Sequence, residues 1–199
     1  MTLKQMIARV MRALPSMPPG AIGENDIIDI LNQAQKHLSR ISSKLKVSEF
    51  DLDANYNIVP LPLDLLTLDS VFWKSTSVDR ELYPEKDSLP LGIEDTTVSD
   101  PYRYYTKGSR IMVYPIPGVD ATVSISYIPT PAEMYNDNDT PDLEGSEEYM
   151  IAYTLHRLHM ESASPLMQLW EAEKAKEEFT FLQTTDQNYR TPFQVDINW

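Results

Sequence analysis

The stretch from Pro101 to Pro131 constrains the fold most, because three short runs of β-branched and aromatic residues follow one another there. Turn residues separate the runs, at Lys107-Gly108 and at Pro115-Ile116-Pro117-Gly118. The pattern predicts a three-stranded antiparallel meander. Small hydroxyl residues alternate with apolar ones from Thr122 to Tyr127, so we expect one face of that strand to be buried and the other to meet water or another chain.

Two helices are expected before this β region. Thr2 and Gln5 have the spacing of a capping box, and Pro15 ends the first helix. Asn25 or Asp26 can cap a second helix that runs to about Lys46. Both segments have an apolar stripe at helical spacing, made by Leu3, Met6, Ile7, Val10, Met11 and Leu14 in the first and by Ile27, Leu31, Ala34, Leu38, Ile41 and Leu45 in the second.

The pattern changes to that of strands after Val47. We predict a hairpin from Phe50 to Val59, a strand from Leu68 to Trp73 and a short strand from Arg80 to Pro84. Residues 85–100 have no clean period, and their structure is left open.

Two more helices follow the β region. After the acidic turn Asn136 to Pro141, Ser146 is placed to cap a helix that has Glu147 and Glu148 in its first turn. Ser164-Pro165 is a typical start for the next one. From Asp186 to Trp199 we expect an extended tail whose apolar side chains bind a partner or pack back on the chain's own domain, namely Tyr189, Phe193, Val195, Ile197 and Trp199.

These elements predict an α+β fold. Two N-terminal helices (1–46) and two C-terminal helices (136–185) are expected to form a helical bundle, with an inserted antiparallel β domain (47–135) and an extended C-terminal tail (186–199).

The charge balance limits the function classes. A formal charge of −13 argues against binding to the phosphate backbone of nucleic acid, which depends on clustered Lys and Arg. An acidic wall that lets DNA pass without sticking is compatible with it. No apolar run approaches the length of a membrane span, and the N-terminus lacks the pattern of a signal peptide, so the protein is expected to be made in the cytoplasm and to bind no membrane.

Candidate chemical sites are weak. His156 and His159 stand three apart on a predicted helix, but no third metal ligand accompanies them. Asp51, Asp53 and Asn55 begin like a calcium loop, which then fails at Tyr56 and Pro62. No phosphate-binding glycine loop or nucleophile elbow is present in the sequence. We therefore expect no catalytic residues, metal or cofactor.

The order of elements resembles the head-to-tail adaptor (connector) proteins of tailed bacteriophages. Asn32-Gln33-Ala34-Gln35 is similar to that family's "asparagine, any, alanine, glutamine" helix, and Leu61-Pro62-Leu63-Asp64 to its "leucine, proline, any, aspartate" entry to a strand. The meander and the exit turn Asp137 to Pro141 also match, whereas Glu144 to Glu147 departs from the family's usual Pro-Glu helix start. The matched part ends near Gln187.

The resemblance implies a homo-oligomeric ring, usually of twelve subunits, in the neck of the virion. Such a ring binds beneath the portal protein, extends the DNA channel for genome packaging and ejection, and offers its lower face to the tail or tail-tube (nozzle) protein. Double-stranded DNA then passes without sequence-specific binding. On this hypothesis Asp137 and Asp139 face the channel or the tail, and the apolar residues of the C-terminal tail bind the portal or a neighbouring subunit.

Two other functions stay open at the level of sequence. A β-sheet module of the phage tail that binds a glycan or receptor would use Tyr102, Tyr104, Tyr105 and Tyr114 as stacking platforms. An acidic hydrolase would need a specific pair of carboxylates, for which Glu147 and Glu148 are candidates.

Overall fold

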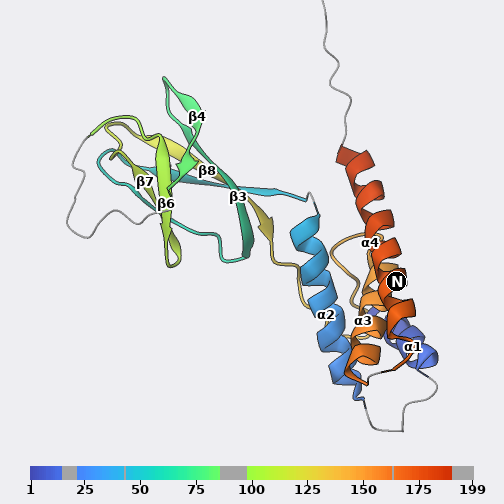
Figure 1. Cartoon of the computed structure of the whole chain (residues 1–199). Coiled ribbons are helices and arrows are strands. Elements are labelled where there is room, and N and C mark those ends of the chain that lie inside the picture. The colour runs from blue at the N-terminus through green and yellow to red at the C-terminus, as the bar shows by residue number, and fades with distance from the viewer. Residues whose placement is uncertain (15–21, 43, 86–97, 163, 190–199) are drawn as a thin grey trace, which may run out of the picture. The chain divides into compact units, whose positions relative to one another are not determined.

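The computed structural model describes residues 1–14, 22–42, 44–85, 98–162 and 164–189, and Figure 1 shows its elements. These residues form an α+β fold with four helices and two β-sheets. The chain divides into two compact units. One, here called the helical unit, comprises Met1–Ser43 and Thr130–Trp199, and the other, the β unit, comprises Lys44–Pro129.

The helical unit contains α1 (Leu3–Ala13), α2 (Glu24–Ile41), α3 (Glu147–Glu161) and α4 (Met167–Tyr189). The apolar stripes of α1 and α2 pack with α3 and with Phe181 of α4 in one hydrophobic core. The capping box of Thr2 and Gln5 is present, with the Gln5 N–H donating to Thr2 Oγ1 and the Thr2 N–H donating to Gln5 Oε1. Met11, which the stripe of the first helix included, is exposed instead.

Helix α2 differs from its prediction at both ends. Gly23 is the N-cap residue, and Asp26 accepts a hydrogen bond from its N–H at 2.8 Å. The helix ends at Ile41 rather than near Lys46, because Lys46 already pairs with Tyr127 as the first residue of a strand. Leu45, predicted as part of the helical stripe, is exposed.

The two C-terminal helices begin close to their predicted starts. Ser146 is the N-cap residue of α3, but its hydroxyl donates to the sulfur of Met150 and makes no capping bond. Ser164 accepts the N–H of Leu166 just before α4. Helix α4 continues to Tyr189, so the extended tail predicted from Asp186 does not begin there.

The β unit has two four-stranded sheets. The first has the order β1 (Lys46–Leu52), β8 (Ala121–Pro129), β3 (Leu65–Lys74) and β4 (Asp79–Glu81). The second has the order β2 (Ile58–Pro60), β7 (Arg110–Tyr114), β6 (Arg103–Lys107) and β5 (Tyr83–Pro84). All pairs are antiparallel except β5 with β6. Side chains from both sheets share one core, which includes Leu52, Trp73, Ile111 and Ile125.

The strand pairing departs from the sequence-based prediction in three places. β6 and β7 form the expected hairpin, but β8 pairs with β1 and β3 in the other sheet, so the three strands are not a meander. β1 and β2 likewise pair with β8 and β7 and not with each other, which overturns the predicted hairpin from Phe50 to Val59. The segment from Arg80 to Pro84 divides between the two sheets as β4 and β5.

The hydroxyl face of β8 is also buried, contrary to the prediction. Ser124 and Ser126 lie in the centre of the first sheet, with β1 on one side and β3 on the other. Ser124 Oγ donates to Glu49 at 2.9 Å, and Lys74 binds the same carboxylate oxygen at 3.0 Å. Side chains from the two neighbouring strands therefore cover the face that a period of two assigns to solvent.

Candidate functional site

The acidic turn that carries Asp137 and Asp139 holds the start of α1. The backbone oxygens of Asp139 and Asp137 accept the N–H groups of Leu3 and Lys4, at 2.8 and 3.2 Å. These N–H groups belong to the first turn of the helix and have no partner within it. The turn therefore supplies the helix with acceptors from a part of the chain more than 130 residues away.

The two carboxylates of this turn have different environments. Asp139 accepts the backbone N–H groups of Asn136 and Tyr135, each at 2.8 Å, and these hydrogen bonds lower the pKa of Asp139. Asp137 is exposed and lies 2.7 Å from Lys4 Nζ. Asp139 thus shapes the turn, while Asp137 presents its charge at the surface of the helical unit.

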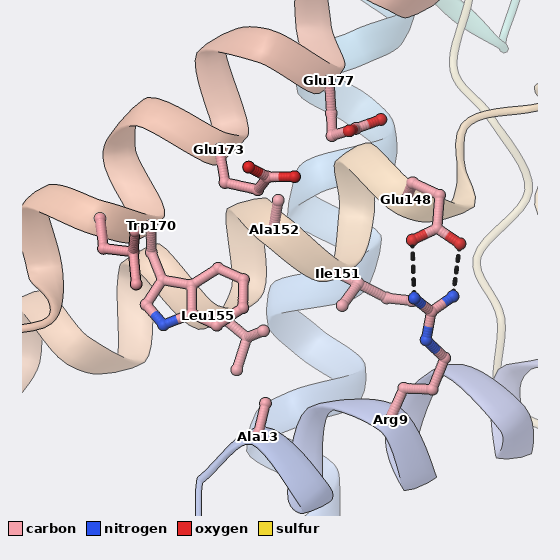
Figure 2. A pocket seen from close by; sticks show the side chains of 10 residues that line it. Arg9, Ala13, Glu148, Ile151, Ala152, Leu155, Trp170, Glu173 and Glu177 are labelled. Atoms are coloured by element: carbon pink, nitrogen blue, oxygen red, sulfur yellow. Dashed lines mark hydrogen bonds and ion pairs between the residues drawn. The ribbon is translucent and has the colours of Figure 1, made fainter.

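A pocket of about 340 Å³ lies between α1, α3 and α4 of the helical unit. Figure 2 shows apolar and charged side chains from these helices around it. The apolar residues are Ala13, Ile151, Ala152, Leu155, Leu169 and Trp170, and the charged ones are Arg9, Glu148, Glu173 and Glu177.

The charged side chains that line the pocket are mostly acidic, and they form ion pairs. Arg9 binds both carboxylate oxygens of Glu148, as the dashed lines in Figure 2 mark, and the hydrogen bonds raise the pKa of Arg9. Lys176 lies 2.9 Å from Glu173 and 3.4 Å from Glu177. The pocket could receive an apolar side chain from a partner. The sequence patterns did not predict this pocket, because residues from three helices line it. The signal present was Ala152, a small residue among large ones in α3.

The two histidines of the predicted pair lie in different surroundings. His159 is 3% exposed and stacks on Trp170 of α4, with ring centroids 6.3 Å apart and planes at 5°. Neither of its ring nitrogens has a hydrogen-bond partner among the described residues, and burial lowers the pKa of His159. His156 is half-buried on the same helix. In the part of the chain that the structure describes, no three His, Cys, Asp or Glu side chains come together in a way that could hold a metal ion.

The tyrosines proposed as a stacking platform do not form one. Tyr104 and Tyr114 are buried, and Tyr114 stacks on Tyr105 at 5.1 Å and accepts its hydroxyl hydrogen bond at 2.9 Å. Burial, aided by this hydrogen bond, raises the pKa of Tyr105 to about 12. Tyr102 is exposed. The two candidate acids of a hydrolase are also engaged, since Glu148 binds Arg9 and Glu147 lies 2.7 Å from the amino group of Met1.

The predicted tail residues fall mostly outside the described structure. Tyr189 is the last residue of α4. Phe193, Val195, Ile197 and Trp199 lie beyond the described residues.

The two motifs that carried the resemblance make long-range hydrogen bonds. Gln35 Nε2 donates to the Ala132 oxygen at 2.8 Å, and Gln35 Oε1 accepts the Asp142 N–H at 3.0 Å, while Asn32 bonds to Met134 in the same segment. Asp64 accepts hydrogen bonds from Lys46 Nζ at 2.7 Å and from the buried Tyr127 hydroxyl at 2.8 Å. The motif residues therefore fix main-chain segments and strands that are distant in the sequence.

Comparison with known proteins bears on the whole chain. No curated protein matches the sequence. A family model described as SU10 adaptor protein matches residues 1–196, which extends the resemblance past Gln187 into the C-terminal tail. Together with the motif residues whose contacts are described above, this match shows that the chain belongs to the SU10 adaptor protein family, a family of bacteriophage head-to-tail adaptors.

Proposed function

We propose that this chain is the repeating subunit of a ring, of twelve copies, that binds beneath the portal and provides the attachment surface for the tail. The observation that carries the proposal is the family match over residues 1–196, since an adaptor family implies interaction with portal and tail components. The same family relationship supports a structural role in the neck of the virion, with synthesis in the host cytoplasm. None of the helices in the described ranges is long and apolar enough to span a membrane.

In this proposal the helical unit is a bundle into which the β unit is inserted as a separate domain. The supporting observation is that each unit has its own hydrophobic core. A ring built from such subunits can use one unit for contacts between subunits and the other for contacts with the portal or tail.

The proposed channel carries DNA without binding it. A subunit charge of −13 means that a ring of these chains repels the phosphate backbone, so that the duplex moves past without adhering. Asp137 is the better candidate of the two acidic residues for the channel or the tail-facing surface, because its carboxylate is exposed, while that of Asp139 is occupied by two backbone N–H groups.

The channel role of Asp137 can be tested in virions that carry Asp137→Asn or Asp137→Lys. We expect DNA ejection to slow progressively from wild type to the neutral and then to the basic variant. Equal ejection and DNA retention in all three would remove Asp137 from the channel.

The C-terminal tail is proposed as the anchor on the portal or on a neighbouring subunit, through Tyr189, Phe193, Val195, Ile197 and Trp199. The test compares the full chain with a chain that lacks Asn188 to Trp199, in cosedimentation with the portal protein of the same phage. We expect the shortened chain to retain the circular dichroism of the folded protein and to lose portal binding. Unchanged cosedimentation would contradict this anchor.

Binding of a glycan or receptor is not favoured by a specific observation. Stacking of a sugar requires exposed aromatic faces, and two of the four tyrosines that would supply them are buried.

A further inference from the structure

Strand β1 is the long edge of the β unit. The sheet orders place β1, β4, β2 and β5 at the four edges. Three of these strands have features that discourage further pairing, because β4 has three residues, β2 ends at Pro60 and β5 is the dipeptide Tyr83–Pro84. β1 has seven residues and no proline. It is therefore the edge at which an additional strand can pair.

The outer side of β1 has no backbone partner among the described residues. Its ladder is with β8 alone, from Lys46 with Tyr127 to Leu52 with Ala121. No residue of β1 makes another backbone hydrogen bond within the described chain. Alternate residues of an antiparallel edge strand direct N–H and C=O groups away from the sheet, so β1 presents a row of such groups.

Apolar surface accompanies this open edge. Val47 is 58% exposed but lies on the other face of β1 from Phe50 and Leu52, so it is not part of this surface. Phe50 packs against the core of the β unit yet stays half-buried, whereas Leu52 on the same face is buried. The core is thus incompletely covered along β1, and a strand with apolar residues on that face would complete it.

The segment Phe193–Trp199 has the pattern of such a strand. Its seven residues alternate strictly between apolar and polar, with Phe193, Val195, Ile197 and Trp199 on one face and Gln194, Asp196 and Asn198 on the other. It equals β1 in length, follows Pro192 directly and contains no glycine. Addition of an extended peptide to an open sheet edge uses main-chain hydrogen bonds for affinity and alternate side chains for specificity.

We propose that Phe193–Trp199 of a neighbouring subunit pairs with β1 as an additional antiparallel strand and links successive subunits of the ring. This inference rests on the proposed function. Each subunit has one such segment and one such edge, so a head-to-tail arrangement uses every one of them when the ring closes.

The added strand is expected to be antiparallel to β1. Every existing pair of the first sheet is antiparallel, and antiparallel pairing is the more stable per residue.

Charge selects one register. In the registers that keep the apolar residues on the face of Phe50, Asp196 lies opposite Val47, Glu49 or Asp51. Opposite Glu49 or Asp51 it would face a like charge, which destabilises a cross-strand pair. Opposite Val47 it faces no like charge. In that register Phe193 lies opposite Phe50, which adds an aromatic pair over the open part of the core.

The absence of cysteine from the sequence permits a direct test. Full-length chains with Val47→Cys and full-length chains with Asp196→Cys are mixed, assembled with the portal and oxidised. Directly opposed residues of an antiparallel pair are close enough for a disulfide. We expect a disulfide-linked dimer of about 46 kDa, twice the 22.8 kDa of one chain.

Two matched mixtures control for chance contact. Val119→Cys is exposed in the same unit but lies outside β1, and Val195→Cys lies on the opposite face of the added strand. Replacing either partner by these variants should abolish the dimer. Dimers of equal yield in the control mixtures would overturn the proposal, because they would show contact without register.

The remaining outcomes separate this inference from the proposed function. An assembly that forms on the portal without the disulfide overturns the added strand and leaves the ring intact. A disulfide that forms only within one chain carrying both substitutions also overturns it. Failure of the wild-type chain to associate with the portal or with itself overturns the proposed function and, with it, this inference.

Discussion

Asn32 and Met134 are joined by two hydrogen bonds across 102 residues of sequence. Asn32 Nδ2 donates to the Met134 oxygen at 3.1 Å, and the Met134 N–H donates to Asn32 Oδ1 at 2.9 Å. Both residues are buried. Asn32 thus gives the main chain of Met134 the donor and the acceptor that a neighbouring strand would otherwise supply. These bonds fix the segment that leads from β8 toward α3.

Replacement of Asn32 by alanine should destabilise the helical unit, because the buried N–H and C=O groups of Met134 lose their partners. The expected loss in the free energy of unfolding is about 1–3 kcal/mol for each group left unsatisfied. Urea unfolding followed by far-UV circular dichroism measures it. Gln33→Ala is the matched control, since Gln33 is exposed on the next position of the same helix. Equal effects of the two substitutions would contradict the role of Asn32.

The Tyr127 hydroxyl gives a second prediction, in the β unit. Tyr127 is fully buried, and its hydroxyl donates to Asp64. Tyr127→Phe removes this bond while keeping the ring, so the expected destabilisation is about 1 kcal/mol. Faster hydrogen exchange of the β8 amides would report it. The exposed Tyr56 supplies the control Tyr56→Phe, for which we expect no change in β8.

Asp64 predicts a dependence of stability on acid. The hydrogen bond from Lys46 lowers the pKa of Asp64 most in the folded state, and the hydrogen bond from Tyr127 lowers it further. A group whose folded pKa is lowered contributes stability that is present above its unfolded pKa and is lost as the pH falls through the folded value. The β unit of Asp64→Asn should therefore lose less stability than wild type between pH 5 and pH 2, roughly the range in which this carboxylate titrates. Parallel curves of unfolding midpoint against pH would exclude this contribution.

His159 predicts pH dependence in a higher range. Because burial lowers the pKa of His159 below 6.5, the unfolded chain binds a proton at a pH at which the folded chain does not. The stability of the helical unit should then decrease as the pH falls below about 6.5. His159→Phe keeps a ring against Trp170 and should flatten that decrease, measured by urea unfolding at pH 7.5 and 5.5. Carboxylates titrate in both proteins, so the difference between them isolates His159. No difference would contradict the assignment.

Local patterns in the sequence predicted the helices well. Thr2 and Gln5 form the expected capping box, and Leu3, Met6, Ile7 and Val10 are buried at the expected spacing, because both signals depend on neighbours within one helical turn. The strand from Leu68 to Trp73 also lies within β3.

Long-range pairing was not predictable in the same way. A period of two states which residues of β8 share a face, but it does not state which strands lie on either side. The neighbours of Ser124 are Glu49 and Phe72, 75 and 52 residues away, and these determine that its face is buried. The pocket of Figure 2 was missed for the same reason, because three helices supply its walls.

Asp139 makes contacts in the structure that its place in the sequence does not specify. The prediction that Asp139, like Asp137, faces the channel or the tail stays a prediction. In the structure the carboxylate of Asp139 accepts the N–H groups of Tyr135 and Asn136, and its backbone oxygen accepts the Leu3 N–H. The composition of the turn was informative about its location, but the contact with α1 depends on how the two ends of the chain come together.

Native mass spectrometry can show whether the chain assembles into a ring on the portal, as we propose. The purified protein is measured alone and after mixing with the portal protein of the same phage. We expect an added mass of about 270 kDa on the portal, twelve times the 22.8 kDa of one chain. A portal of unchanged mass beside a free species of 22.8 kDa would contradict it.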